Sequence, residues 1–313
     1  MSRYTKLISF AIPCYNEEQN VFPCYEALTH IAKRLPKYRF EYVFADNGST
    51  DRTAKRIQSL AKKDKRVKAV CLSRNFGPEA SQQATIDYST GDAVIPYDAD
   101  MEDPANVIPL FVRKWEEGFD IILGIRTTID NNGAMTLLRR IYYRLFHAIA
   151  DIDIPVDAGA FSLLDRKVVD AIRALPETYR FFRGLRAWVG FRTATIPYQR
   201  QKRFSGKSSS NIFLYLSLAQ RSFFGFSYLF LSIIVYLGFF LTLLSFVFLT
   251  VYLLAQVGSK STIDSFTIII SVIVMLGGMQ LLALSVIGKY IQVIVEETKK
   301  RPLYVVGSTI NVR

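Results

Sequence analysis

The residues with the clearest capacity for chemistry form an acidic cluster at residues 98–103, which reads D-A-D-M-E-D. The cluster follows a short apolar run, residues 93–95, that predicts a buried strand. Side chains two residues apart on an extended chain point to the same side, so Asp98 and Asp100 can converge on one point. Converging carboxylates repel each other unless a cation lies between them. We therefore expect a Mg²⁺ or Mn²⁺ site that also holds substrate phosphates, with a solvated acidic turn as the alternative.

The elements that must position this cluster are strands and helices in alternation, which predict a mostly parallel, doubly wound α/β sheet. Strands are expected at residues 6–13, 40–45, 67–73, 93–95, 121–125 and 193–198. Polar clusters directly follow the first four strands: Tyr15-Asn16-Glu17, Asp46-Asn47, Arg74-Asn75 and Asp98/Asp100. Because ligands bind at the carboxyl ends of the strands in such sheets, the clusters should gather on one rim. Four clusters in succession favour a nucleotide and metal site over solvated loops.

The charge balance is strongly basic, with 39 basic and 27 acidic residues and a formal net charge of +12. Residues 180–207 carry eight basic residues and no acidic one, which suits anionic lipid head groups or a phosphate-bearing substrate. We expect no nucleic-acid partner. The three cysteines, Cys14, Cys24 and Cys71, have no metal-ligand spacing and are typical of free thiols in a reducing compartment. No secretory signal is expected, because the N-terminal apolar run is short and polar residues follow it.

Membrane character is concentrated in the last third of the chain. Residues 223–257 and 265–288 contain no charged side chain. At the rise of an α-helix these stretches reach roughly 50 and 36 Å, against a hydrocarbon core of about 30 Å. Two transmembrane helices within residues 223–297 are the prediction, with a buried helical hairpin as the alternative. Residues 208–222 are apolar with few charges and predict a helix lying in the membrane interface.

The orientation in the membrane follows from the positive charge on both sides of the predicted spans. Basic residues lie before the first span and at Lys299, Lys300 and Arg301 after the second. The positive-inside rule therefore predicts that both termini and the N-terminal domain, residues 1–207, lie in the cytoplasm. We expect an integral protein of the inner (cytoplasmic) membrane. The tail at 298–313 is expected to include an exposed strand that could pair with another subunit, so a homo-oligomer is expected.

Taken in order, the motifs resemble the family 2 glycosyltransferases of the GT-A fold that transfer a sugar to a polyprenyl phosphate. The resemblance is strongest to bactoprenol glucosyltransferases and dolichol-phosphate mannose synthases that carry two C-terminal helices. The matching stretches are I-P-C-Y-N-E-E (12–18), F-A-D-N-G-S-T-D (44–51), S-R-N-F-G (73–77), D-A-D-M-E-D-P (98–104), D-A-G-A-F-S-L-L-D-R (157–166), R-G-L-R-A-W-V-G-F (183–191) and E-T-K-K-R-P-L-Y (297–304). They extend over nearly the whole chain.

The resemblance implies a role for each matching position. The residues implied in binding the base and ribose of the nucleotide are Pro13, Tyr15, Glu17 and Asp46, with Asp98 beside them. The residues implied in holding the metal on the donor diphosphate are Asp98, Asp100 and Glu102. The residues implied in binding phosphates of donor or acceptor are Arg126, Arg139 and Arg203, for which snorkelling at the membrane surface is the alternative. Asp157 would lie near the acceptor, and Asp100 and Asp157 are the expected catalytic residues.

Several positions depart from the family pattern. Asn47 stands where a second acidic residue is common, Pro78 replaces a frequent lysine, and Glu102 replaces a frequent glutamine. Ala160 and Ser162 stand where the glucosyl members commonly have an acidic residue and an arginine. These changes fall near the expected sugar and acceptor pockets. They leave the sugar open and the reaction class intact.

The expected reaction is an inverting, metal-dependent transfer of a hexose, with glucose from UDP-glucose favoured, to undecaprenyl phosphate. The phosphate acceptor is already ionised near neutral pH, so Asp157 is expected to orient it more than to abstract a proton. The same reaction with mannose from GDP-mannose, galactose or an amino sugar stays open. Two further alternatives are a processive polysaccharide synthase and a non-catalytic, membrane-anchored nucleotide-sugar binding or flippase-associated protein.

Overall fold

The computed structural model describes residues 5–127, 158–177, 180–201, 203–205 and 265–312, together with five separate helical positions, 234, 236, 240, 243 and 247. Eight strands form one sheet in the order β7-β5-β6-β4-β1-β2-β3-β8. Their bounds are β1 Leu7–Cys14, β2 Arg39–Asp46, β3 Val67–Leu72, β4 Ala93–Pro96, β5 Ile121–Arg126, β6 Ala158–Asp165, β7 Thr193–Tyr198 and β8 Val306–Ile310.

The central strands are parallel, as the alternation of strands and helices predicts. Strand β1 pairs in parallel with β2 and β4, β2 pairs in parallel with β3, and β5 pairs in parallel with β7. Strands β6 and β8 run antiparallel to their neighbours. The predicted α/β fold with a mostly parallel, doubly wound sheet is therefore confirmed. Strand β6 was not among the predicted strands, and its sequence, A-G-A-F-S-L-L-D, begins with small residues that are typical of a turn.

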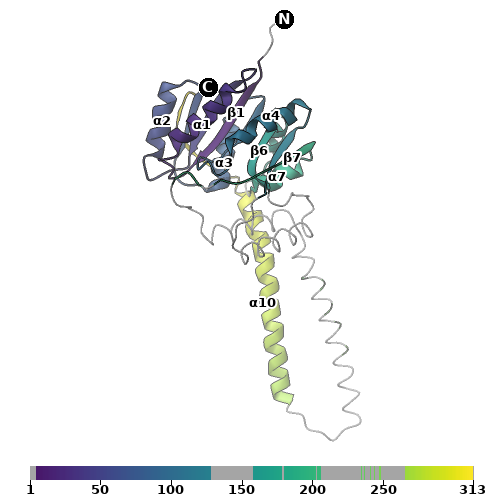
Figure 1. The fold of residues 1–313 in the computed structure, drawn as a ribbon. Helices are drawn as coiled ribbons and strands as arrows, with labels where there is room; N and C mark the ends of the chain where they lie inside the picture. Colours follow the sequence, from purple (N-terminus) through teal and green to yellow (C-terminus); the bar gives the residue numbers. More distant parts are fainter. Residues whose placement is uncertain are drawn as a thin grey trace.

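Helices cover both faces of the sheet (Figure 1). Their bounds are α1 Val21–Lys33, α2 Thr53–Lys63, α3 Pro78–Asp87, α4 Ile108–Glu116, α6 Arg166–Ala174, α7 Phe182–Trp188 and α10 Ser265–Thr298, with a short 3-10 turn at Ala105–Val107. Side chains of α1, α2 and α4 share one hydrophobic core, and those of α6 and α7 share a second core with Ile86 of α3. Alternate residues of β1 enter the two cores, since successive side chains of a strand point to opposite faces.

Helix α10 stands apart from the α/β domain as a single long rod (Figure 1). Its 34 residues extend over about 51 Å, and large apolar side chains such as Phe266, Leu281 and Leu284 are more than 60% exposed. Within the described part of the chain, Leu276–Thr298 is the one segment long and apolar enough to cross a membrane. The predicted interfacial helix at 208–222 lies outside the described residues, as does the first predicted span except for its five helical positions.

The C-terminal tail returns from α10 to the sheet. The tail was expected to be an exposed strand that could pair with another subunit, and it forms β8, which pairs antiparallel with β3 of its own chain. The side chain of Asn311 secures this return by donating to the backbone carbonyls of Ala61 and Val67. The outer edge of β8 is the end of the sheet, and pairing with a second subunit there stays a prediction.

Candidate active site

The residues singled out in the sequence follow neighbouring parallel strands. Strands β4, β1, β2 and β3 are adjacent and parallel, so the segments that follow them share one rim of the sheet. Pro13 lies at the end of β1 and Tyr15 just beyond it, and both are half-buried. Asp46 is the last residue of β2, and Asp98 comes two residues after β4. The expected convergence on one rim is therefore observed for these residues.

The loops after β1 and β2 are joined by hydrogen bonds. The backbone amide of Asn16 donates to Ser49 Oγ at 2.9 Å, and the Asn16 side-chain oxygen accepts from the amide of Thr50 at 2.9 Å. The amide of Glu17 donates to Thr53 Oγ1 at 2.8 Å. Asn16 adopts a left-handed conformation with φ 54°, which asparagine tolerates better than most residues. The C-Y-N-E-E and D-N-G-S-T-D motifs therefore form one hydrogen-bonded unit.

Asp46 presents an unused acceptor inside this unit. The residue is 3% exposed, and its Oδ2 accepts from the amide of Ser49 at 3.3 Å. Its Oδ1 is buried and has no hydrogen-bond partner among the residues that the structure describes. Burial raises the pKa of this carboxyl above its ordinary value, although the bonds from Ser49 oppose the rise. A buried acceptor without a donor is costly unless a ligand supplies the donor. The geometry suits the predicted contact with a nucleotide.

Asn47 ties the loop after β2 to the loop after β3. Its amide nitrogen donates to Asn75 Oδ1 and to the carbonyl of Gly77, both at 3.1 Å, and its side-chain oxygen accepts from the amide of Phe76 at 3.0 Å. An aspartate at this position could not donate the first two bonds. The departure from the family pattern at Asn47 therefore has a structural reason.

Burial raises the pKa values of the two carboxylates Asp98 and Asp100, which follow β4. Burial, together with the nearby Asp103 and Asp100 carboxylates, raises the pKa of Asp98 to about 7, while Arg126 and Arg183 act in the opposite direction. Burial also raises the pKa of Asp100, against the influence of nearby arginines. Adjacent carboxylates that are costly to ionise are the kind of site that a divalent cation relieves.

The three-carboxylate metal set is not assembled in this structure. Among the described residues, no group of three or more His, Cys, Asp or Glu side chains is positioned to hold a metal ion. The carboxylate of Glu102 is instead paired with the guanidinium of Arg200. The pair Asp98 and Asp100 still fits Mg²⁺ or Mn²⁺, which usually take one or two carboxylates and fill the remaining positions with water and substrate phosphates.

The segment after β7 lies against the acidic residues. Arg203 is ion-paired with Glu17 and lies 3.6 Å from Asp100, measured between guanidinium nitrogen and carboxylate oxygen. The backbone amides of Gln201 and Phe204 donate to the carbonyls of Glu102 and Asp100. The Nε of Arg203 is buried, and no hydrogen-bond partner for it lies in the described part of the chain. Arg203, predicted to bind phosphate, therefore lies beside the acidic residues, and its guanidinium contacts the carboxylates of Glu17 and Asp100.

Arg126 lies at the carboxyl end of β5, on the same rim. Its Nη2 is 3.3 Å from a carboxylate oxygen of Asp103, and its Nε donates to the hydroxyl of Tyr198 at 3.0 Å. Asp103 belongs to the acidic cluster, but the sequence assigned it no role because nothing in the pattern names its partner. Arg183 also belongs to a noted motif without an assigned role, and it lies close enough to lower the pKa of Asp98. Asp157 and Arg139 lie outside the described residues.

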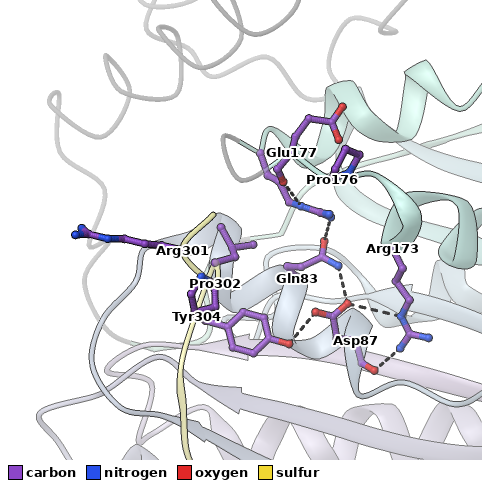
Figure 2. A pocket seen from close by; sticks show the side chains of 10 residues that line it. Gln83, Asp87, Arg173, Pro176, Glu177, Arg301, Pro302 and Tyr304 are labelled. Carbon is purple, nitrogen blue, oxygen red and sulfur yellow. Dashed lines mark hydrogen bonds and ion pairs between the residues drawn. The ribbon is translucent and has the colours of Figure 1, made fainter. Parts of the chain in front are cut away.

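A separate hollow of about 410 Å³ lies between α3, the end of α6 and the segment that follows α10 (Figure 2). In this hollow the hydroxyl of Tyr304 donates to Asp87 at 2.7 Å, and Arg173 is ion-paired with the same carboxylate. Arg180 donates to the side-chain oxygen of Gln83 at 2.8 Å. None of the predicted site residues lines it. The bond from Tyr304 to Asp87 fastens the segment that follows α10 to the α/β domain.

The fold and the polar rim agree with the comparison to known families. Residues 9–173 match the family model described as glycosyl transferase family 2. The chain belongs to this family and is a glycosyltransferase.

Individual relatives match over nearly the whole chain. It is 37% identical to the uncharacterized glycosyltransferase sll0501 of Synechocystis sp., over 96% of this chain and 94% of the relative. It is 34% identical to the uncharacterized glycosyltransferase YkcC of Bacillus subtilis, over 100% of this chain and 96% of the relative. It is also 34% identical to the bactoprenol glucosyl transferase of Shigella phage SfX, over 96% of this chain and 99% of that relative.

Proposed function

We propose that this glycosyltransferase moves a hexose from a nucleotide diphosphate sugar to the phosphate of a membrane polyprenyl phosphate, with UDP-glucose and undecaprenyl phosphate as the favoured pair. The observation that carries the proposal is the meeting of acidic and basic side chains on one rim. Asp100 lies 3.6 Å from Arg203, and Asp98 lies close enough to Arg126 and Arg183 for both to lower its pKa. Carboxylates beside arginines are the arrangement that a metal-bound diphosphate requires. Full-length similarity to proteins named bactoprenol glucosyl transferase supports the choice of acceptor and sugar.

On the donor side, Asp46 supplies the unused buried acceptor for the nucleotide, within the unit formed by the first two loops. Pro13, Tyr15 and Glu17 border the same unit and complete the proposed nucleotide site. Asp98 and Asp100, with Glu102 beside them, would hold Mg²⁺ or Mn²⁺, which when bound supplies positive charge to the leaving diphosphate. Arg203 exchanges its carboxylate partners for a phosphate when the donor binds.

On the acceptor side, an oxygen of the polyprenyl phosphate attacks the anomeric carbon while the bond from that carbon to the donor diphosphate breaks. A single displacement of this kind inverts the anomeric centre. The attacking phosphate is ionised near neutral pH, because its second pKa is about 6, so no strong general base is needed. We assign the orientation of the acceptor to Asp157 and the binding of phosphates to Arg126 and Arg139.

The acceptor lipid requires an active site at a membrane surface, and the chain provides a means of holding it there. Helix α10 carries an exposed apolar surface, and three basic residues directly follow it: Lys299, Lys300 and Arg301. We propose that residues 1–207 form a cytoplasmic catalytic domain, that 208–222 lie in the interface, that 223–297 span the inner membrane twice, and that 298–313 return to the cytoplasm.

The test is a transfer assay on the full-length protein in detergent. UDP- and GDP-sugars are offered with undecaprenyl phosphate and Mg²⁺ or Mn²⁺, and label is counted in the organic phase. We expect label from one donor, lost with Asp100→Asn and with a chelator. Asp92→Asn is the matched control, because Asp92 precedes the same strand β4 at its other end and accepts from the amide of Leu7. Nucleotide binding without transfer from any donor would refute the proposal.

A further inference from the structure

Among the described carboxylates on the rim, Asp103 has the smallest exposed fraction. It is 2% exposed, and its Oδ1 accepts a hydrogen bond of 2.5 Å from the hydroxyl of Tyr198. Both of its carboxylate oxygens lie within 3.4 Å of Arg126 Nη2. Its backbone carbonyl accepts from the hydroxyl of Tyr97 at 2.8 Å. The position of the Asp103 side chain is therefore set from several directions.

Arg126 is held from the remaining sides by its neighbours. Its Nε donates to the same Tyr198 hydroxyl that donates to Asp103, which closes a ring of three side chains. Arg126 and Tyr198 are paired residues at the ends of the parallel strands β5 and β7. The guanidinium also lies over Gly159, where a Cβ would approach Nη2 to 3.2 Å. The plane of the guanidinium is therefore fixed.

This arrangement leaves one edge of the guanidinium without a hydrogen bond to any described residue. The hydrogen bonds use Nε and Nη2, and across the described residues none uses Nη1. Arg126 keeps 22% of its side chain exposed, while Asp103 keeps 3%. Buried ion pairs contribute little net stability compared with apolar residues of similar volume, so a purely structural role explains this pair poorly. If Asp103 instead orients the guanidinium of Arg126 toward a ligand, both the burial of Asp103 and the partial exposure of Arg126 are explained.

We propose that Asp103 is a positioning residue that acts through Arg126, by fixing the guanidinium so that its Nη1 edge faces a substrate phosphate. The inference rests on the proposed function, because the phosphate is that of the donor or the acceptor of the transfer. The geometry requires only a phosphate group, and the experiment separates the two sources.

The first test measures binding rather than transfer, so it is independent of whether the transfer assay succeeds. The dissociation constants of UDP with Mn²⁺ and of farnesyl phosphate are measured by calorimetry on the full-length protein in detergent. We expect Asp103→Asn to weaken one of the two ligands about 10- to 100-fold, as Arg126→Ala does, with no further loss in the double variant. If the dissociation constant of UDP rises, the phosphate that Arg126 binds is that of the donor. If the dissociation constant of farnesyl phosphate rises, it is that of the acceptor.

The second test is chemical rescue. Guanidinium chloride at millimolar concentration should restore ligand binding to Arg126→Ala, because Asp103 and Tyr198 still form its cradle. It should fail to restore binding to the Arg126→Ala, Asp103→Asn double variant. A merely structural Asp103 would give equal rescue in both. Tyr198→Phe is a milder perturbation of the same cradle than Asp103→Asn. The ring keeps its edge contact with Phe161, and only the hydroxyl is lost.

The matched control is Glu41→Gln. Glu41 is also a buried, ion-paired carboxylate, 2.8 Å from Lys68 Nζ, and it lies in β2 away from the rim. The Glu41→Gln substitution should lower the melting temperature without changing the dissociation constant of UDP or of farnesyl phosphate. The proposal is overturned if Asp103→Asn lowers only the melting temperature, as Glu41→Gln does, or if its effect on binding adds fully to that of Arg126→Ala.

Discussion

Gly48 lies where the loop after β2 meets the loop after β3, and we predict that alanine at this position forces the two loops apart. Its φ of +67° is in the left-handed region, which costs an L residue about 1–2 kcal/mol. A Cβ at Gly48 would lie 2.4 Å from the carbonyl carbon of Arg74 and 2.7 Å from the amide nitrogen of Asn75. The first distance is about 1 Å short of ordinary contact. Both obstacles are backbone atoms, so a side-chain rotation cannot relieve them.

The displacement falls next to the proposed nucleotide site. Asp46 is two residues from Gly48 and carries the buried, unpartnered oxygen, and Asn47 makes the bonds to the next loop. A shift of about 1 Å at a binding group can reduce activity by roughly 100-fold. We therefore expect Gly48→Ala to lower kcat/KM for the nucleotide sugar by up to that factor, mainly through KM. The melting temperature should fall as well, because of the left-handed strain.

Gly77→Ala is the control that separates strain from collision. Gly77 also has a positive φ, +93°, but no atom lies within 4 Å of its Cβ position. Its amide and carbonyl bonds to Asn75 and Asn47 do not involve the added methyl group. Gly77→Ala should lose stability yet keep KM within a few-fold of the parent. Equal values of KM for the two variants, or wild-type nucleotide affinity in Gly48→Ala, would show that the reasoning is wrong.

Three further substitutions have expected outcomes. Glu41→Gln should lower the free energy of unfolding by about 3–5 kcal/mol, since it leaves Lys68 without its buried partner. Burial alone would raise the pKa of Glu41, but its hydrogen bonds outweigh this and lower it. The parent should therefore lose stability in chemical denaturation as pH falls below about 4.3, and the variant should lack this component. Arg203→Ala should lower kcat by roughly 100-fold in initial-rate assays, and rates equal to the parent would exclude a role in phosphate stabilisation. Tyr304→Phe removes the bond to Asp87 and should lower the free energy of unfolding by about 1–2 kcal/mol with KM unchanged; a raised KM would contradict the assignment of this contact to fastening the tail.

Local patterns in the sequence determined the class of fold and the place of the site. Alternating strands and helices require crossover connections, which make the central strands parallel and bring their carboxyl ends to one rim. The polar residues after β1, β2 and β4 were therefore predictable neighbours, and Asp46, Asp98 and Asp100 lie where that rule requires. The departure at Asn47 was visible in the sequence, but its reason was not.

Only the tertiary structure decided which charges meet. Arg203 is ion-paired with Glu17 across 186 residues of sequence, and Arg126 shares Asp103 with a tyrosine from β7. The partners of β6 and β8 were equally undetermined, because an edge or small-residue strand carries no signal for the neighbour it will choose. Hydrophobic periodicity records which face of an element is buried. It does not record which side chain from a distant segment arrives there, since that depends on how the packed layers bring the segments together.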